Sequence, residues 1–177
     1  MSIQVHDKRF VPYLSAQTIQ ERIDALANEI SNDYKDKEPL FVGILNGSFV
    51  FAADLFKKIS IPACISFIKL ISYKGTSSTG TVLTSIGLEE NINDKDIIIV
   101  EDIVDTGKTL TEFLPTLMKQ NPRSIKICTL LQKPDAQLFP LDVDYVGFSI
   151  PNKFVVGYGL DYDGLGRNYD AIYQLAD

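Results

Sequence analysis

The sequence predicts an α/β domain with a mostly parallel central sheet flanked by helices. Short apolar runs alternate along the chain with segments whose apolar residues recur at helical spacing. The runs at residues 40–45 and 97–100 contain no polar side chain, which is typical of parallel strands covered on both faces. A chain of 177 residues can form one domain with a full core, and we expect a single domain over residues 1–177.

Two helices and three strands are expected in the first half of the chain. Apolar residues share one face from Ile19 to Tyr34, and this helix could be capped by Ser15, or by Thr18 with Glu21 at capping-box spacing. A second helix follows an Asn-Gly-Ser turn and runs from Phe49 to about Ile59. The expected strands occupy residues 40–45, 61–71 and 82–86.

The second half continues the alternation of strands and helices. After the buried strand at 97–100, a helix is expected from Lys108 to Lys119, with Pro122 marking its end. Further strands are expected at residues 124–131, 143–150 and 155–160. Ligands of open parallel sheets bind beyond the carboxyl ends of the strands, so polar residues at those ends are the first candidates for a site.

Composition and charge exclude several classes of function. The chain has 17 Lys and Arg against 23 Asp and Glu, and a net charge of −6 disfavours binding to nucleic acid or to anionic membranes. Its one histidine, His6, excludes Cys2His2 zinc sites, His-Glu-x-x-His metalloproteases and two-histidine iron sites. Cys64 and Cys128 lie among apolar residues and are expected to be buried thiols. Without a signal peptide or an apolar run of about 18 residues, the protein is expected to be cytoplasmic, with no membrane segment.

The most informative stretch is Glu-Asp-Ile-Val-Asp-Thr-Gly-Lys-Thr at residues 101–109, between the buried strand and the next helix. Residues 106–109 suit an anion, because backbone amides, two hydroxyls and the positive end of a helix converge there. Glu101 and Asp102 can accept hydrogen bonds from ribose hydroxyls, and their charge would stabilise positive charge on a ribose carbon. The stretch therefore predicts a site for a sugar that carries one phosphate.

Two other interpretations of this stretch are weaker. A P-loop requires Gly where this chain has Asp102, and three acidic side chains would repel a triphosphate. A strand end with solvated acids and an ordinary helix cap would explain an isolated carboxylate pair, but it leaves the rest of the nine-residue pattern unexplained.

Residues 100–109 resemble the phosphoribosyl pyrophosphate (PRPP) signature of the type I phosphoribosyltransferases, most closely that of the hypoxanthine-guanine enzymes. Residues 67–73 resemble the family's strand into a mobile lid, and residues 130–133 its strand with a purine-contacting lysine. Residues 146–161, followed by Arg167, resemble its base-binding hood.

The resemblance spans residues 11–175 and implies the type I phosphoribosyltransferase fold. In that fold a small hood, here the N-terminal segment and residues 150–177, covers the carboxyl ends of the strands. The implied reaction belongs to purine salvage: ribose 5-phosphate passes from PRPP to hypoxanthine or guanine, giving IMP or GMP and pyrophosphate. Mg²⁺ would neutralise the leaving pyrophosphate while the ribose becomes oxocarbenium-like.

The resemblance also implies roles for single residues. Asp105 would exchange a proton with purine N7 and, together with Thr106, Gly107, Lys108 and Thr109, surround the 5-phosphate, while Glu101 and Asp102 hold the ribose and contact Mg²⁺.

Four residues are implied in binding the base. A lysine donates and cannot accept hydrogen bonds, so Lys133 suits the 6-oxo group of hypoxanthine or guanine and disfavours adenine. Phe154 would stack on the base, and the backbone of Val155 would contact its edge. Asp161 would lie beside the purine as the second metal contact, although Asp163 is chemically able to replace it.

The pyrophosphate would meet Asn46, Gly47 and Arg167. The family usually has Lys or Arg where this chain has Asn46, so pyrophosphate binding would depend more on backbone amides and Mg²⁺ here. The family also often has a non-proline cis peptide in this loop. Ser72 and Tyr73 would begin a mobile lid over about residues 72–87, which keeps water from the cationic ribose.

Two alternatives to this function stay open. The first is a phosphoribosyltransferase for xanthine or a pyrimidine, which small changes in the hood could allow. The second is an RNA-binding regulator on the same fold, which the acidic composition disfavours. The family usually forms homodimers or homotetramers, for which unassigned apolar residues such as Phe10, Val11 and Tyr13 could supply an interface.

Overall fold

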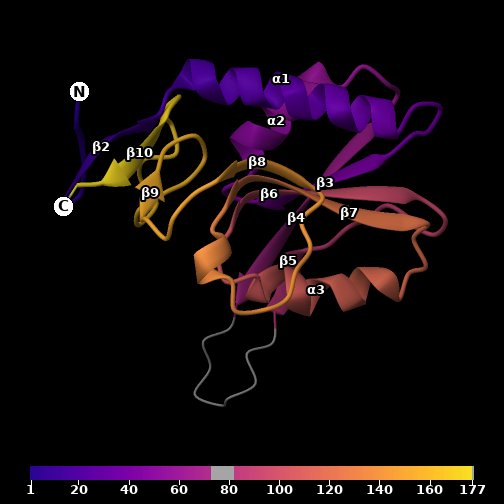
Figure 1. Cartoon of the computed structure of the whole chain (residues 1–177). Coiled ribbons are helices and arrows are strands. Elements are labelled where there is room, and N and C mark those ends of the chain that lie inside the picture. Colours follow the sequence, from indigo (N-terminus) through magenta and orange to yellow (C-terminus); the bar gives the residue numbers. More distant parts are fainter. Residues whose placement is uncertain (73–81, 177) are drawn as a thin grey trace, which may run out of the picture.

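The computed structural model describes residues 1–72 and 82–176, and it contains two separate sheets (Figure 1). The larger sheet has the strand order β5-β4-β3-β6-β7-β8. Five strands are parallel neighbours, and only β5 runs antiparallel, against β4. The strands are β3 (Leu40–Leu45), β4 (Cys64–Ser72), β5 (Val82–Ile86), β6 (Asp96–Val104), β7 (Ser124–Gln132) and β8 (Tyr145–Ser149). The expected mostly parallel α/β fold is confirmed.

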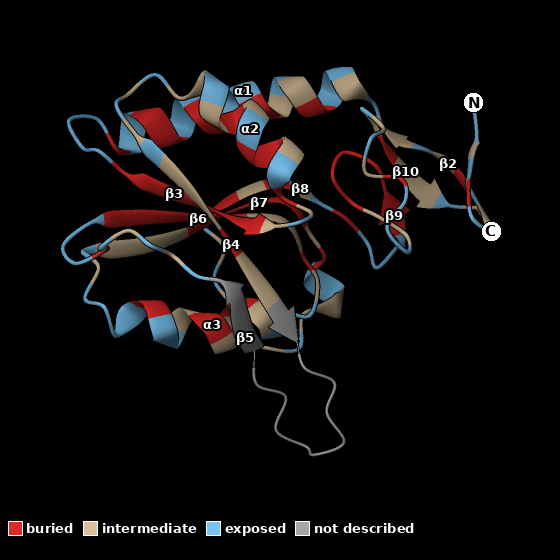
Figure 2. Ribbon diagram, turned by 180° about the vertical axis from the view of Figure 1, so that it is seen from behind, coloured by how far each residue is buried: buried red, intermediate tan, exposed pale blue. Residues whose placement is uncertain are grey.

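Helices cover both faces of this sheet. Helices α1 (Ala16–Asp33) and α2 (Phe49–Lys58) lie on one face and α3 (Lys108–Met118) on the other (Figure 1). Side chains alternate along β6: Ile98 packs in the core under α1 and α2, whereas Ile97 and Ile99 pack in the core under α3. This double burial, seen as red strands in Figure 2, explains why the run has no polar residue. No helix in the described ranges is long and apolar enough to span a membrane.

The first helix begins where the simpler of the two caps predicts. The Ser15 hydroxyl accepts a hydrogen bond from the backbone amide of Thr18 at 3.1 Å, and the two side-chain hydroxyls lie 2.7 Å apart. Ser15 is therefore the N-cap, and Thr18 lies in the first turn.

The smaller sheet joins the two ends of the chain. Its strands are β1 (Ile3–Val5), β2 (Lys8–Leu14), β9 (Val155–Val156) and β10 (Ile172–Leu175), in the antiparallel order β1-β2-β10-β9. It lies at one end of the molecule, where the two termini meet (Figure 1). Together with the loop between β9 and β10 we call it the hood. Three buried residues form its own small core: Val5, Phe10 and Val156.

Three local predictions were wrong, and three strands were not predicted. The strand expected at 155–160 stops at Val156, because Gly157, Tyr158 and Gly159 have φ values of 99°, 50° and 96° and turn the chain away. The strand expected from residue 61 begins at Cys64, whose side chain is exposed at the strand's start rather than buried. Strands β1, β2 and β10 were not expected, and Phe10, named as a possible interface residue, is instead fully buried in the hood.

Candidate active site

The turn between β6 and α3 forms a pocket of about 230 Å³ lined by Ile44, Leu70, Glu101 and residues 103–110. Gly107 caps α3 with φ of +80°, and a Cβ there would approach the carbonyl oxygen of Phe139 to 3.0 Å, so glycine is required. The carbonyl of Thr106 accepts hydrogen bonds from the amides of Leu138 and Phe139, both at 3.0 Å. The segment after β7 thus holds the turn in place, and six of the seven residues expected at this site line the pocket, all except Asp102.

The adjacent acids Glu101 and Asp102 lie at the carboxyl end of β6. Burial, and then repulsion from Asp102, raises the pKa of Glu101 well above its usual range. Burial also raises the pKa of Asp102, although a hydrogen bond from the amide of Ile103 at 2.9 Å and the positive charge of Arg167 act against it. Such carboxylates are stabilised by any hydroxyl or cation that reaches them.

The loop that precedes α2 lies directly against this acid pair. The peptide bond between Leu45 and Asn46 is cis. Gly47 is so close to the Asp102 carboxylate that a Cβ at position 47 would overlap it. The Ser48 hydroxyl is buried and donates to the carbonyl of Ile44 at 2.7 Å, which fixes the loop to β3. Gly47 therefore lies beside Asp102, and Asn46 precedes it in the same loop.

Arg167 reaches the same end of the sheet from the hood. One guanidinium nitrogen donates to the carbonyl of Gly159 at 2.6 Å, and another lies 2.8 Å from Asp161. The backbone of Gly159 lies against the carbonyl oxygen of Gly47, and a Cβ at position 159 would overlap that oxygen. Asp161, rather than Asp163, is thus the carboxylate that joins this group.

Lys133 and Asp105 form an ion pair, with 3.0 Å between the Lys133 ammonium and a carboxylate oxygen. The Lys133 side chain is only 7% exposed and that of Asp105 is 46% exposed, so the pair links the interior to the open pocket. The Lys133 amide also donates to the carbonyl of Val104 at 2.9 Å. The pairing of the parallel strands β6 and β7 produces this contact, which sequence reasoning missed although both residues were candidates.

Phe154 has the exposure expected of a stacking residue. Its ring is 42% exposed and packs edge-on against Tyr162 at 5.6 Å and tilted against Phe10 at 5.9 Å. Val155 is buried in β9. The segment leading to them leaves β8 beside Lys133, because the amide of Ile150 donates to the carbonyl of Gln132 at 2.8 Å. Tyr162, which supports Phe154, was not among the candidates.

The three candidate metal ligands do not gather into one cluster. Within the described residues no group of three or more acidic, histidine or cysteine side chains is placed to share an ion. Mg²⁺ in phosphoryl and pyrophosphate sites keeps several waters and needs only one or two carboxylates. The adjacent oxygens of Glu101 and Asp102 fit that requirement, whereas Asp161 already accepts hydrogen bonds from Arg167 and from the amide of Gly164.

Of the expected lid, the structure describes only its two edges. Ser72 ends β4 and residues 82–86 form β5, which pairs with it. Tyr73 and the rest of 73–81 lie outside the described residues.

Comparisons with known proteins identify the family. The family model for the phosphoribosyl transferase domain matches residues 13–163. The chain is 45% identical to a hypoxanthine-guanine phosphoribosyltransferase of Mycobacterium avium, over 92% of this chain and 83% of that protein. It is 36% identical to the Aquifex aeolicus enzyme of the same name, over 98% and 99%.

Solved structures give the same result. The fold is similar to that of a hypoxanthine-guanine phosphoribosyltransferase from Bacillus anthracis, with a TM-score of 0.88 and 37% identity over 94% of this chain and 97% of that one. A hypoxanthine phosphoribosyltransferase from Staphylococcus aureus gives a TM-score of 0.89 and 40% identity, with 94% and 91% covered. By sequence and by structure, the chain belongs to the type I phosphoribosyltransferase family, among the hypoxanthine-guanine enzymes.

Proposed function

We propose that this enzyme of purine salvage transfers the 5-phosphoribosyl group of PRPP to hypoxanthine or guanine, giving IMP or GMP and pyrophosphate. The observation that carries the proposal is the Lys133–Asp105 pair at the edge of the pocket between β6 and α3. A buried donor beside a half-exposed carboxylate offers complementary partners to O6 and N7, which are neighbours on a 6-oxopurine. The family and the names of the relatives point to the same reaction.

The sugar phosphate would occupy the pocket. The amides at the start of α3, with the hydroxyls of Thr106 and Thr109 and the ammonium of Lys108, would surround the 5-phosphate together with Gly107 and Asp105. Glu101 and Asp102 would accept hydrogen bonds from the ribose hydroxyls. Both carboxyls have raised pKa values in the free enzyme, so hydroxyl donors and an adjacent cation would favour their charged forms.

The same acids would stabilise the reacting sugar. As pyrophosphate leaves, positive charge grows on the ribose ring, and carboxylates in a pocket with little water attract it strongly. Mg²⁺, when held by Glu101 and Asp102, would neutralise the charge of the departing pyrophosphate. Asn46, Gly47 and Arg167 would bind the pyrophosphate, and Ser72 with Tyr73 would begin the lid that closes over it.

The base would be held between strand ends and hood. Lys133 would donate to the 6-oxo group, Phe154 would stack on the purine and the backbone of Val155 would contact its edge, beside Asp161. Asp105 would take the proton from N7, or return it in the reverse direction. We also propose a cytoplasmic homodimer or homotetramer that binds small molecules and no nucleic acid, in keeping with the net charge of −6.

One assay tests the reaction. Purified protein would be incubated with PRPP and Mg²⁺ and, separately, hypoxanthine, guanine, xanthine, adenine or uracil, and each nucleotide would be quantified. We expect IMP and GMP, no AMP, and loss of all product when EDTA removes Mg²⁺. Xanthosine or uridine monophosphate alone would overturn the base assignment, and no product from folded protein would overturn the enzyme.

Replacing Lys133 with Gln is expected to lower kcat/KM for hypoxanthine and guanine about 10- to 100-fold, the loss of one charge-assisted hydrogen bond. An amide can also accept, so adenine should be discriminated against less strongly. Steady-state kinetics with all three bases would measure both effects. Lys126→Gln is the matched control, because Lys126 lies on the same strand but pairs with Asp144 at 3.8 Å. An unchanged ratio of hypoxanthine to adenine use would refute the role of Lys133.

A further inference from the structure

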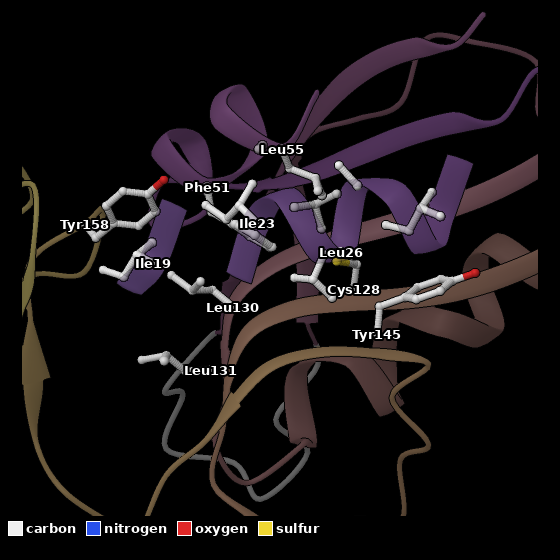
Figure 3. Packing of buried hydrophobic residues seen from close by; sticks show 14 of the residues in the cluster. Ile19, Ile23, Leu26, Phe51, Leu55, Cys128, Leu130, Leu131, Tyr145 and Tyr158 are labelled. Atoms are coloured by element: carbon white, nitrogen blue, oxygen red, sulfur yellow. The ribbon is translucent and has the colours of Figure 1, made fainter. Parts of the chain in front are cut away.

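Tyr158 belongs by sequence to the hood but by packing to the main core. It lies between two glycines of positive φ and has a φ of +50° itself, so the chain makes a sharp excursion at this point. Its side chain is 2% exposed and joins the core cluster of Ile19 and Phe51, not the hood cluster of Phe10 and Val156. Figure 3 shows the ring beside Ile19. A tyrosine in this place brings a hydroxyl into an apolar region, where it needs a partner.

That partner is a hydrogen-bonded group between α1 and α2. The Tyr158 hydroxyl donates to Asp54 of α2 at 2.5 Å, and the side-chain amide of Gln20 on α1 donates to the same carboxylate oxygen at 2.9 Å. Gln20 also contacts the Tyr158 oxygen at 3.1 Å, and Lys57 pairs with the other oxygen of Asp54 at 2.7 Å. Burial raises the pKa of Asp54, but the hydrogen bonds from Lys57, Tyr158 and Gln20 outweigh it and leave the pKa below its usual value. Asp54 is thus a charged acceptor at the centre of the group.

Asp54 and Tyr158 lie on either side of residues 45–48, the loop proposed to bind pyrophosphate, which we call the pyrophosphate loop. Asp54 lies on α2, the helix that begins directly after residues 45–48. Tyr158 is followed by Gly159, whose backbone lies against the carbonyl oxygen of Gly47 and accepts a hydrogen bond from Arg167. Gly47 in turn touches Asp102. The hydrogen bond between Tyr158 and Asp54 therefore closes a ring of contacts through the hood, the loop and α2, and this ring touches the acid pair at Asp102.

We propose that Tyr158, held by Asp54 and Gln20, is a positioning residue that fixes the hood segment with Gly159 and Arg167 against the pyrophosphate loop. The inference rests on the proposed transfer reaction, because it concerns the site for the pyrophosphate group of PRPP. The 5-phosphate pocket between β6 and α3 and the Lys133–Asp105 pair lie outside this ring. Loss of the Tyr158 hydroxyl should therefore weaken ligands that carry pyrophosphate and spare ligands that do not.

The test is Tyr158→Phe, compared with Tyr145→Phe. Tyr145 is an unusually close control: its side chain is also 2% exposed, belongs to the same core cluster, and donates to an aspartate, Asp33, at 2.7 Å. Dissociation constants for PRPP and for IMP would be measured by calorimetry, with kcat and KM. Tyr158→Phe is expected to raise Kd and KM for PRPP about tenfold and to change Kd for IMP less than about twofold. Tyr145→Phe should leave the ratio of the two constants unchanged.

Equal effects of the two variants on the ratio of PRPP to IMP affinity would overturn the positioning role and leave Tyr158 as a packing residue. If Tyr158→Phe does not fold, Gln20→Met is the second test, because it removes the amide contacts to both Asp54 and Tyr158 from the half-buried surface of α1. A change in the ratio of PRPP to IMP affinity in the same direction would support the role. An unchanged ratio would refute it. Failure of the proposed function is distinguishable, since the unmodified enzyme would then form neither IMP nor GMP.

Discussion

Replacing Asp105 with Asn is expected to lower kcat by about 10²- to 10⁴-fold, the usual contribution of a positioned general base, while Kd for PRPP changes little. The amide keeps the shape of the carboxylate, and its oxygen can still accept the hydrogen bond from Lys133. It cannot take the proton from N7, so the loss falls on turnover rather than on binding. Single-turnover kinetics with hypoxanthine, together with calorimetry for PRPP, would separate the two steps.

Asp135→Asn provides the control for this experiment. Asp135 lies on the short helical turn of residues 134–136, two residues after Lys133, and it is exposed. The substitution makes the same change of charge close to the site without touching the pair. Loss of PRPP affinity in Asp105→Asn with normal turnover at saturation would show that Asp105 binds phosphate and is not the base.

Elements with a strong local pattern could be predicted from the sequence. The strand at 40–45 and the strand at 82–86 have the expected bounds, and the helix after Gly107 begins at the expected residue. The hood could not be predicted in the same way, since β1 and β10 are short, β2 contains Pro12, which disfavours a strand, and the strands pair between opposite ends of the chain. The prediction of a strand at 155–160 was wrong because the apolar residues after Val156 are buried within a turn of left-handed backbone conformation rather than in an extended strand.

The same distinction between local patterns and long-range contacts applies to the candidate site. Residues 101–109 are contiguous, so their chemistry is visible in the sequence, and the pocket gathers most of them. The contacts between Lys133 and Asp105, and between Gly47 and Asp102, join residues from different strands and loops. They depend on strand register and on close approach of backbones, which no local pattern encodes. The resemblance to a family identified these residues as candidates, but only the structure shows which of them contact one another.

Gly47→Ala is expected to weaken PRPP binding about 10- to 100-fold, corresponding to about 1.4 to 2.8 kcal/mol. The added methyl group would overlap the Asp102 carboxylate, which is held by the amide of Ile103 at 2.9 Å. Either Asp102 rotates and gives up that hydrogen bond, or the loop moves away from β6. Both outcomes displace a group proposed to hold PRPP, and overpacking of this kind costs about 1–3 kcal/mol. Calorimetric Kd for PRPP measures the effect.

A second variant shows whether the overlap itself is the cause. If Gly47→Ala acts by displacing the Asp102 carboxylate, it should cost much less when introduced into Asp102→Ala, because the overlapping atoms are gone. Additive effects of the two substitutions would contradict this explanation. They would mean that Gly47 is needed for the conformation of the loop itself, and that the contact with Asp102 is incidental.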